Sequence, residues 1–359
     1  MPPPSSILVI SLRYFGDVLL TTPLIRSLRR GFPDATIDVL VIAGAEGILE
    51  GNPDLQGVVT IAERPSGKAH RALVRRLWRR YDLAVIAETG DRPHLYGWIA
   101  ARRRAGLLPP SPATRWWKEP LLRHGVLFAP HESRVESYGR LAQAMALPFT
   151  AEVVPPTAGT PTAAWCARLG FDAARERYAV LHLSPRFRYK RWNAEGWRSL
   201  VLWLHARGLR IVVTGGGAPD ERDYVRDVLA NSSAPVIDRA GELRFGETAD
   251  LLRGAALYVG PDTATSHLAA ACGTPSVILF GPTDPRLWGP LPRGGLDRPY
   301  EKVAPSQRRA NVILLQEVSL PCVPCQQEGC EHHRDSYSAC LDRMSGNRVI
   351  EAARTISGI

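Results

Sequence analysis

The chain has 359 residues, of which 45% are hydrophobic and 22% are charged, and its formal net charge is +10. These proportions exclude a largely disordered chain, and the length favours two domains over a single core. The apolar run before Arg13 is too short for a secretion signal or a membrane span, and no later run reaches about 18 apolar residues. We therefore expect a cytoplasmic protein.

The positive charge is concentrated in the first half of the chain. Residues 1–150 hold twenty Lys and Arg against thirteen Asp and Glu, and the densest basic stretches are 68–80, 101–104 and 115–118. The stretch 68–80 has the pattern of an amphipathic helix, whose basic face is either simply solvated or attracts an anionic substrate or membrane leaflet. No nucleic-acid-binding motif accompanies this charge, so we do not expect nucleic acid as a partner.

The first short β-branched run leads directly into the sequence SLRYFGDVLLTTP, residues 11–23. Such a loop at a helix entrance usually binds phosphate, yet Asp17 brings a negative charge to it. Asp17 either caps the helix or is available for chemistry. Because Thr21 or Thr22, followed by Pro23, would cap the helix equally well, the second interpretation is open.

Short β-branched runs alternate with helical stretches in both halves of the chain. They cover residues 7–12, 36–42, 58–61 and 83–87, and then 178–184, 209–214, 256–260, 276–280 and 311–315. This alternation is typical of parallel sheets, and the Pro-, Thr- and Gly-rich residues 150–165 between the two series are typical of a linker. We predict an α/β protein with two Rossmann-like domains, residues 1–155 and 156–345, that face each other across a cleft.

Loops that follow strands of the second half carry groups suited to a nucleotide diphosphate. One loop starts at Ser184 and contains Lys190, which either neutralises a phosphate or belongs to an exposed basic loop. The next loop starts with Gly215 and Gly216, which allow a ligand to approach the backbone or merely form a tight turn. Asp220 or Glu221 then follows in a position to accept hydrogen bonds from ribose hydroxyls.

The most informative loop lies within residues 258–285 and opens a helix of small apolar residues. Five polar residues surround the start of this helix, namely Asp262, Thr263, Thr265, Ser266 and His267. Helix capping accounts for one of them. Together with the helix dipole, the group has the character of a diphosphate receptor, although a histidine here can also be a satisfied core residue.

Four cysteines near the C-terminus have the spacing C-x2-C-x4-C-x9-C and are Cys322, Cys325, Cys330 and Cys340. Thiolates at such spacing can bind zinc or iron, so a structural metal is one interpretation of the cluster. Unmodified thiols are the other.

Several of these stretches, taken together, resemble glycosyltransferase family 9, the bacterial lipopolysaccharide heptosyltransferases. The stretches are FGDVLLTTPLIRSLRR, YKRW, GGGAPDE, GPDTATSHLAAACGTP and FGPTDP, in this order along the chain. The stretch PCVPCQQEGCEHHRDSYSACLDRM, residues 321–344, further resembles the heptosyltransferase III branch.

The resemblance implies a GT-B fold and an inverting transfer of heptose from ADP-L-glycero-D-manno-heptose to the inner core of lipopolysaccharide. It implies Asp17 as the catalytic base, Lys190 at the donor phosphates and Glu221 at the ribose. It places Asp262, Thr263 and His267 at the diphosphate-sugar region of the donor. We further expect donor contacts at Ser184, Gly215, Gly216 and Thr265, and the acceptor beside Arg13 and Gly16. By analogy with GT-B folds, the terminal helix within 346–359 is expected to pack back onto the N-terminal domain.

Two other functions are also compatible with the sequence. The first is a GT-B glycosyltransferase with another nucleotide sugar, or with a protein or glycan acceptor. The second is a non-catalytic module that binds metal or nucleic acid. No cofactor is required for the leading interpretation, because Lys190 and a helix N-terminus can stabilise the leaving group. A basic N-terminal half also suits an anionic, lipid-anchored acceptor, so we expect a peripheral protein at the cytoplasmic face of the inner membrane.

Overall fold

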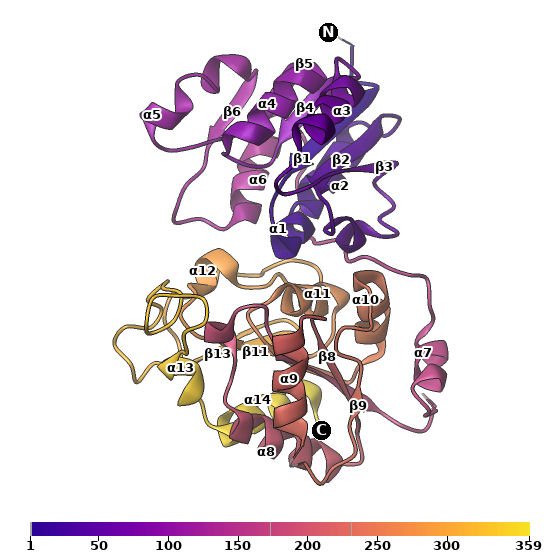
Figure 1. Ribbon diagram of the computed structural model, residues 1–359, viewed down its shortest axis with the longest axis vertical. Helices are drawn as coiled ribbons and strands as arrows, with labels where there is room; N and C mark the ends of the chain where they lie inside the picture. Colours follow the sequence, from indigo (N-terminus) through magenta and orange to yellow (C-terminus); the bar gives the residue numbers. More distant parts are fainter. Residues whose placement is uncertain (1, 173, 231) are drawn as a thin grey trace. The chain divides into compact units, whose positions relative to one another are not determined.

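The computed structural model describes residues 2–172, 174–230 and 232–359, which form two compact units (Figure 1). Unit 1 comprises residues 1–156 and unit 2 comprises residues 157–359. The boundary lies one residue beyond the predicted end of the first domain. None of the described helices combines the length and the apolar character needed to cross a membrane.

Unit 1 is built on one parallel sheet of six strands in the order β3-β2-β1-β4-β5-β6. The strands are β1 (Ser6–Ser11), β2 (Thr36–Ile42), β3 (Gly57–Ile61), β4 (Tyr81–Ile86), β5 (Ala101–Leu108) and β6 (His124–Leu127). The helices are α1 (Phe15–Leu20), α2 (Thr22–Gly31), α3 (Gly67–Leu77), α4 (Asp91–Ala100), α5 (Pro112–Arg115) and α6 (Arg134–Ala144), with short 3-10 turns at Glu46–Leu49 and Glu119–Leu121. This strand order is that of a Rossmann-like domain.

Two of the predicted basic stretches in unit 1 have structural roles. The stretch 101–104 begins β5, the strand next to the edge strand β6, where Arg104 donates hydrogen bonds to the carbonyl oxygens of Leu121 and Ala101. Lys118 is 2% exposed, and its ammonium lies 2.6 Å from the carboxylate of Asp91. Arg104 and Lys118 therefore have partners within the fold, as buried charged groups require. The helical stretch 68–80 is the one that presents most of its charge to solvent.

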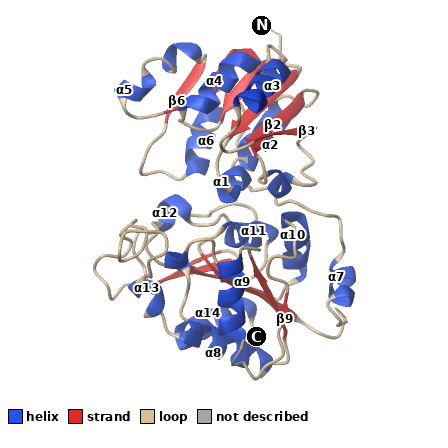
Figure 2. Ribbon diagram, in the orientation of Figure 1, coloured by secondary structure: helices blue, strands red, loops and turns tan. Residues whose placement is uncertain are grey.

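Unit 2 contains a second sheet, in the order β12-β13-β11-β10-β7-β8-β9, in which only β12 is antiparallel to its neighbour. The strands are β7 (Tyr178–Ser184), β8 (Arg210–Gly215), β9 (Ile237–Asp238), β10 (Leu257–Pro261), β11 (Ser276–Phe280), β12 (Ser306–Arg309) and β13 (Val312–Gln316). The helices are α7 (Thr162–Arg168), α8 (Ala194–His205), α9 (Pro219–Leu229), α10 (Phe245–Gly254), α11 (Ala264–Cys272), α12 (Pro285–Trp288), α13 (Ala339–Asp342) and α14 (Gly346–Ser357), with a 3-10 turn at Arg188–Lys190. Figure 2 shows the helices of each unit around its strands.

The terminal helix α14 belongs to unit 2, in contrast to the expectation that it packs on the N-terminal domain. Its buried residues Val349, Ile350, Ala352 and Ala353 are part of the core of unit 2, where α14 packs against α8 and β11.

In each sheet, the strand order reverses between two neighbouring strands. The reversal lies between β1 and β4 in unit 1 and between β7 and β10 in unit 2. Open parallel sheets bind ligands beyond the carboxyl ends of the strands at such a reversal, because the two following loops diverge there and leave a crevice. The residues that follow β1, β4, β7 and β10 are therefore the candidates for a functional site.

The segment predicted as a linker is held by hydrogen bonds within each unit. In unit 1, the backbone N–H of Val154 donates to Oγ1 of Thr22 at 2.9 Å. In unit 2, the carboxylate of Asp250 accepts from the Thr157 hydroxyl at 2.7 Å and from the Thr160 N–H at 2.9 Å. Both ends of the segment are thus anchored.

Candidate functional site

Asp17 lies in the first turn of α1, directly after β1, and is only 7% exposed. Its side chain makes no capping hydrogen bond. Thr21 and Thr22 do not cap α2 either, because their hydroxyls donate backward to the carbonyl oxygens of Asp17 and Leu19. Pro23 does occupy the start of α2 as predicted. The Asp17 carboxylate therefore does not cap the start of a helix.

Two arginines surround the Asp17 carboxylate. Nε of Arg134, the first residue of α6, lies 2.6 Å from Oδ1, and Nε of Arg13 lies 3.5 Å from Oδ2. Among the described residues, Oδ1 has no hydrogen-bond partner, so the Arg134 contact is one of charge and not of an aligned N–H. Oδ1 is thus a buried acceptor atom that lies against a positive charge. The aromatic Tyr14 is 40% exposed.

A second buried carboxyl group, Glu88, lies beside Asp17 and was not among the predicted site residues. It follows β4, is 6% exposed and accepts a hydrogen bond from the backbone N–H of Leu12. Burial raises the pKa of Glu88 to about 7, the nearby Asp17 adds to this rise, and the Leu12 N–H, Arg13 and Arg134 oppose it. Glu88 directly follows the predicted strand 83–87, and this position could have identified it as a site residue from the sequence.

The predicted acceptor residues lie at the same place. Arg13 is in the turn between β1 and α1, and its side chain is 42% exposed. Gly16 lies in the first turn of α1, next to Asp17. The strand-order reversal of unit 1 therefore gathers Arg13, Gly16, Asp17 and Glu88 from two loops.

In unit 2, Lys190 and Asp262 meet at the corresponding reversal. Lys190 comes from the 3-10 turn after β7 and Asp262 from the end of β10, and Nζ lies 2.6 Å from Oδ2. The ammonium also donates to the Asp262 carbonyl oxygen at 3.2 Å. Both side chains are largely buried, at 20% and 8% exposure. A cation held at this position can interact with an anionic ligand.

The loop that carries Lys190 is anchored by the segment near the C-terminus. The Ser338 hydroxyl donates to the Tyr189 carbonyl oxygen at 2.6 Å, and the indole N–H of Trp192 donates to the Met344 carbonyl oxygen at 2.8 Å. Trp192 is buried, and its ring lies 4.9 Å from that of Trp197. The stretch YKRW thus joins the Lys190 cation to a buried aromatic pair.

Glu221 occupies the first turn of α9, where it is 7% exposed, and burial is the main cause that raises its pKa. A Cβ added to Gly216 would lie 1.7 Å from Oε2 of Glu221. A side chain at position 216 would therefore displace the Glu221 carboxyl group. The alternative ribose acceptor, Asp220, instead pairs with Arg191 at 3.1 Å.

Gly215 also lies close to its surroundings. A Cβ added to Gly215 would lie 3.2 Å from the Cβ of Ala240, in the turn that follows β9. The glycine loop thus packs tightly against that turn.

The start of α11 carries the remaining predicted donor residues. Thr263 is its N-cap and makes no side-chain capping bond, while Thr265 and His267 are 7% and 6% exposed. Ser266 has a structural role, because its hydroxyl bonds to the Pro261 carbonyl oxygen and to the Tyr258 hydroxyl. Near this helix start, at the end of β7, the buried hydroxyl oxygen of Ser184 has no hydrogen-bond partner among the described residues.

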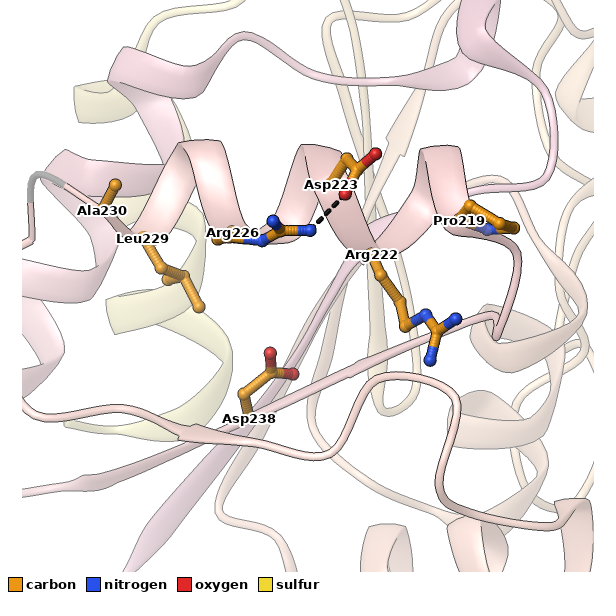
Figure 3. A pocket seen from close by; sticks show the side chains of 7 residues that line it. All are labelled: Pro219, Arg222, Asp223, Arg226, Leu229, Ala230 and Asp238. Atoms are coloured by element: carbon orange, nitrogen blue, oxygen red, sulfur yellow. Dashed lines mark hydrogen bonds and ion pairs between the residues drawn. The ribbon is translucent and has the colours of Figure 1, made fainter.

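A pocket of about 570 Å³ lies along α9 and β9 (Figure 3). It is lined by Pro219, Arg222, Asp223, Arg226, Leu229, Ala230 and Asp238. Arg226 forms an ion pair with Asp223, and the pocket is lined by two basic and two acidic side chains. None of the predicted donor residues lines it, so the pocket is separate from the candidate site.

The four C-terminal cysteines are reduced, and Cys340 is buried whereas Cys322 and Cys330 are exposed. Burial, together with the neighbouring Cys325 and Cys330, raises the pKa of Cys340 to about 12. In the part of the chain that the structure describes, no group of three or more His, Cys, Asp or Glu side chains is arranged to hold a metal ion.

Comparison with known proteins agrees with this geometry. A family model described as glycosyltransferase family 9 (heptosyltransferase) matches residues 72–332. Lipopolysaccharide heptosyltransferase 3 of Escherichia coli is 29% identical over 291 residues, which cover 78% of this chain and 84% of that protein.

Two solved structures have a similar fold over nearly the whole chain. The glycosyl transferase family 9 protein from Veillonella parvula DSM 2008 matches with a TM-score of 0.77 and 18% identity, covering 98% of this chain and 97% of that one. The E. coli ADP-heptose lps heptosyltransferase II matches with a TM-score of 0.74 and 20% identity, covering 98% of each chain. Together with the two Rossmann-like units, these matches show a fold of the GT-B type. Since the family model spans well over half of the chain, the protein belongs to glycosyltransferase family 9 and is a glycosyltransferase of the heptosyltransferase type.

Proposed function

We propose that the protein transfers heptose from ADP-L-glycero-D-manno-heptose to the inner core of lipopolysaccharide, with inversion, as in the heptosyltransferase III branch. The observation that carries this proposal is the chemistry at the two strand-order reversals. One holds a buried carboxylate, Asp17, and the other holds a buried ammonium, Lys190. A base and a phosphate-binding cation are the two groups that such a transfer needs.

On the acceptor side, Oδ1 of Asp17 takes the proton of the attacking hydroxyl. The hydroxyl oxygen then forms a bond to the anomeric carbon on the face opposite the nucleotide, which inverts the configuration. The bond between the anomeric carbon and the phosphate oxygen breaks, and its electron pair leaves with ADP. Arg13 and the backbone at Gly16 contact the acceptor.

On the donor side, Lys190 neutralises the charge that develops on the departing diphosphate. The N-terminus of α11, with Thr263, Thr265 and His267, contributes donors and the positive end of its dipole. The Ser184 hydroxyl and the Gly215–Gly216 backbone complete the donor contacts, and Glu221 accepts hydrogen bonds from the ribose. These groups supply the charge stabilisation of the leaving group, so we propose that the transfer requires no divalent metal.

The experiment measures ADP release from ADP-heptose in the presence of a heptose-deficient lipopolysaccharide core, for the native protein and for Asp17→Asn. We expect acceptor-dependent turnover that falls by about 10²-fold or more in the variant, while ADP-heptose still binds. Turnover that survives addition of a chelator supports the metal-free reaction. Donor binding without turnover in either protein would point to another sugar or acceptor, and a lack of donor binding would contradict the substrate class.

The proposed acceptor is anchored in lipid, and unit 1 carries an exposed surface that suits an anionic membrane. We define the Trp78–Trp98 surface as Trp78, Arg79 and Trp98 together with the basic face of α3. Trp78 and Trp98 are 58% and 40% exposed, and the Arg79 guanidinium lies 5.7 and 5.8 Å from their ring centroids. Exposed Trp beside Arg is the combination found at membrane interfaces, because the indole is amphipathic.

The charge of this surface is not neutralised by the fold. Residues 64–80 contain seven basic residues and no acidic one. In the described parts of the chain, none of Arg71, Arg75, Arg76, Arg79 and Arg80 forms an ion pair with a carboxylate, although all five are exposed. We therefore propose that the protein is cytoplasmic and binds peripherally to the inner membrane through this surface.

Cosedimentation with vesicles tests the membrane proposal. The native protein should bind vesicles that contain about 30% phosphatidylglycerol and release them as salt rises, since the attraction is electrostatic. The double variant Trp78→Ala/Trp98→Ala should lose most of this binding. Trp116→Ala is the matched control, since Trp116 is 72% exposed but follows a different helix. Equal loss in the control, or binding to neutral vesicles alone, would contradict the proposal.

A further inference from the structure

Two carboxyl groups and two arginines meet where β1 and β4 run side by side. Ile10 and Ile86 are register partners, and the Ala87 N–H donates to the Ile10 carbonyl oxygen at 3.0 Å. The residues after these strands, Leu12 and Glu88, are joined in turn by the hydrogen bond from the Leu12 N–H to the Glu88 carboxyl group. The backbone of both strands therefore fixes where Glu88 lies.

Arg134 is the buried cation of this group. Its side chain is 12% exposed, and it interacts with the carboxyl groups of Asp17 and Glu88 and with the Tyr138 hydroxyl. The side chain of Arg13, in contrast, is 42% exposed, so water and salt weaken its attraction to Asp17. Both carboxyl groups thus lie in the field of one buried positive charge, which Asp17 contacts directly.

We propose that Glu88 is a positioning residue that controls, through Arg134, how readily Asp17 accepts the proton of the acceptor hydroxyl. When Glu88 is ionised, its negative charge offsets the charge of Arg134 at Asp17 and makes Asp17 a stronger base. When Glu88 is neutral, Arg134 is paired with Asp17 alone and holds its charge more firmly. This inference rests on the proposed function, in which Asp17 is the base.

The same arrangement assigns a role to Glu88 after proton transfer. Asp17 becomes neutral when it takes the proton, and Arg134 would then be a buried cation without a charged partner. Isolated buried charges are unfavourable, and an ionised Glu88 supplies the missing partner. The proton stays on Asp17 during the step, so Glu88 balances charge and does not touch the substrate.

The proposed role of Glu88 makes the reaction rate depend on pH. Glu88 has a pKa of about 7, and the other charged or titratable groups around it are Asp17, Arg13, Arg134 and Tyr138. Both arginines stay charged, and burial raises the pKa of Tyr138, which stays neutral. We therefore expect kcat to increase as pH rises through about 7, because Glu88 ionises in that interval.

The test compares the native enzyme with Glu88→Gln in steady-state kinetics from pH 5.5 to 9. The variant should lose the increase of kcat near pH 7 and should be about tenfold slower at pH 8, with an unchanged KM for ADP-heptose. Glu88→Asp keeps the charge and should retain the increase. Glu132→Gln is the control, since Glu132 is a partly exposed partner of Arg140 in the same unit.

The kinetics of the Glu88→Gln variant decide whether Glu88 controls Asp17. A Glu88→Gln variant with the native pH profile and rate would overturn the inference, and so would an equal fall of kcat at every pH. If Glu88→Gln does not fold, Arg134→Lys is used, and an unshifted pH midpoint in that variant overturns the inference. If Asp17→Asn leaves turnover intact, the proposed function itself fails, whereas normal kinetics of Glu88→Gln with an inactive Asp17→Asn refute only the role of Glu88.

Discussion

The ammonium of Lys190 lies 2.6 Å from the Asp262 carboxylate, although 72 residues separate the two in the chain. The pair joins the loop after β7 to the end of β10, at the strand-order reversal of unit 2. Asp262 holds the cation in place, so the proposed contact with a donor phosphate needs little rearrangement of Lys190. A preorganised charge of this kind is effective in catalysis because its orientation does not change during the reaction.

Replacement of Lys190 by Ala should reduce kcat by about 10²- to 10³-fold, since one charge that stabilises the leaving group is lost. The rate of ADP release from ADP-heptose in the presence of the lipopolysaccharide core measures this effect. Arg188→Ala is the matched control, because Arg188 begins the same 3-10 turn. Equal losses in both variants would show that general positive charge, and not the position of Lys190, supports the reaction.

Substitution of Gly216 by Ala should weaken ADP binding by about tenfold, because the new Cβ would displace the Glu221 carboxyl group that is proposed to bind the ribose. Gly217→Ala is the control, since its Cβ would meet only the backbone of Gly241 at 3.6 Å, an ordinary contact. Isothermal titration calorimetry with ADP measures both affinities. A Gly216→Ala variant with native ADP affinity would exclude Glu221 from the ribose site.

His182 should make the free energy of unfolding depend on pH. The side chain lies within β7, and burial lowers its pKa to about 4. Between about pH 6.5 and 4, the unfolded chain binds a proton that the folded chain does not, so stability falls as pH falls through this interval. The loss should reach about 3 kcal/mol, taken as an order of magnitude from the size of the pKa shift.

Urea unfolding at pH 7 and pH 4.5 measures this loss for the native protein and for His182→Asn. The variant should lose much less stability between the two pH values. His205→Asn, at an exposed position in the last turn of α8, should behave like the native protein. An unchanged pH dependence in His182→Asn would assign the effect to other groups.

The C-terminal cysteines should contain less than one metal ion per chain in protein purified without a chelator, as measured by elemental analysis. The basis is that burial raises the pKa of the Cys340 thiol to about 12, which opposes the thiolate form that binds a metal. The segment instead supports the Lys190 loop through Ser338 and Met344. One zinc or iron ion per chain, lost in Cys325→Ser, would restore the metal interpretation.

The sequence predicted the runs that form β1 to β4, β7, β8, β10, β11 and β13, because buried parallel strands are short apolar runs and their hydrophobic pattern is local. It did not predict the short strands β6, β9 and β12. The runs 36–42, 178–184 and 276–280 are strands with these same bounds in the structure. Strand β5 was missed because its first residues, Arg102 to Arg104, look like an exposed basic stretch. Arg104 donates hydrogen bonds to backbone carbonyl oxygens, and a local sequence pattern does not predict such contacts.

For the candidate site, the sequence by itself determined the residue types, their order and their places after strands, since turns and helix starts depend on neighbouring residues. Only the tertiary structure decided which of these groups meet. Arg134 reaches Asp17, Glu88 joins them, and Lys190 pairs with Asp262, because the order of the strands brings distant loops to one edge of each sheet. The packing of α14 was decided in the same way, since an amphipathic face specifies that a helix is buried but not against which element.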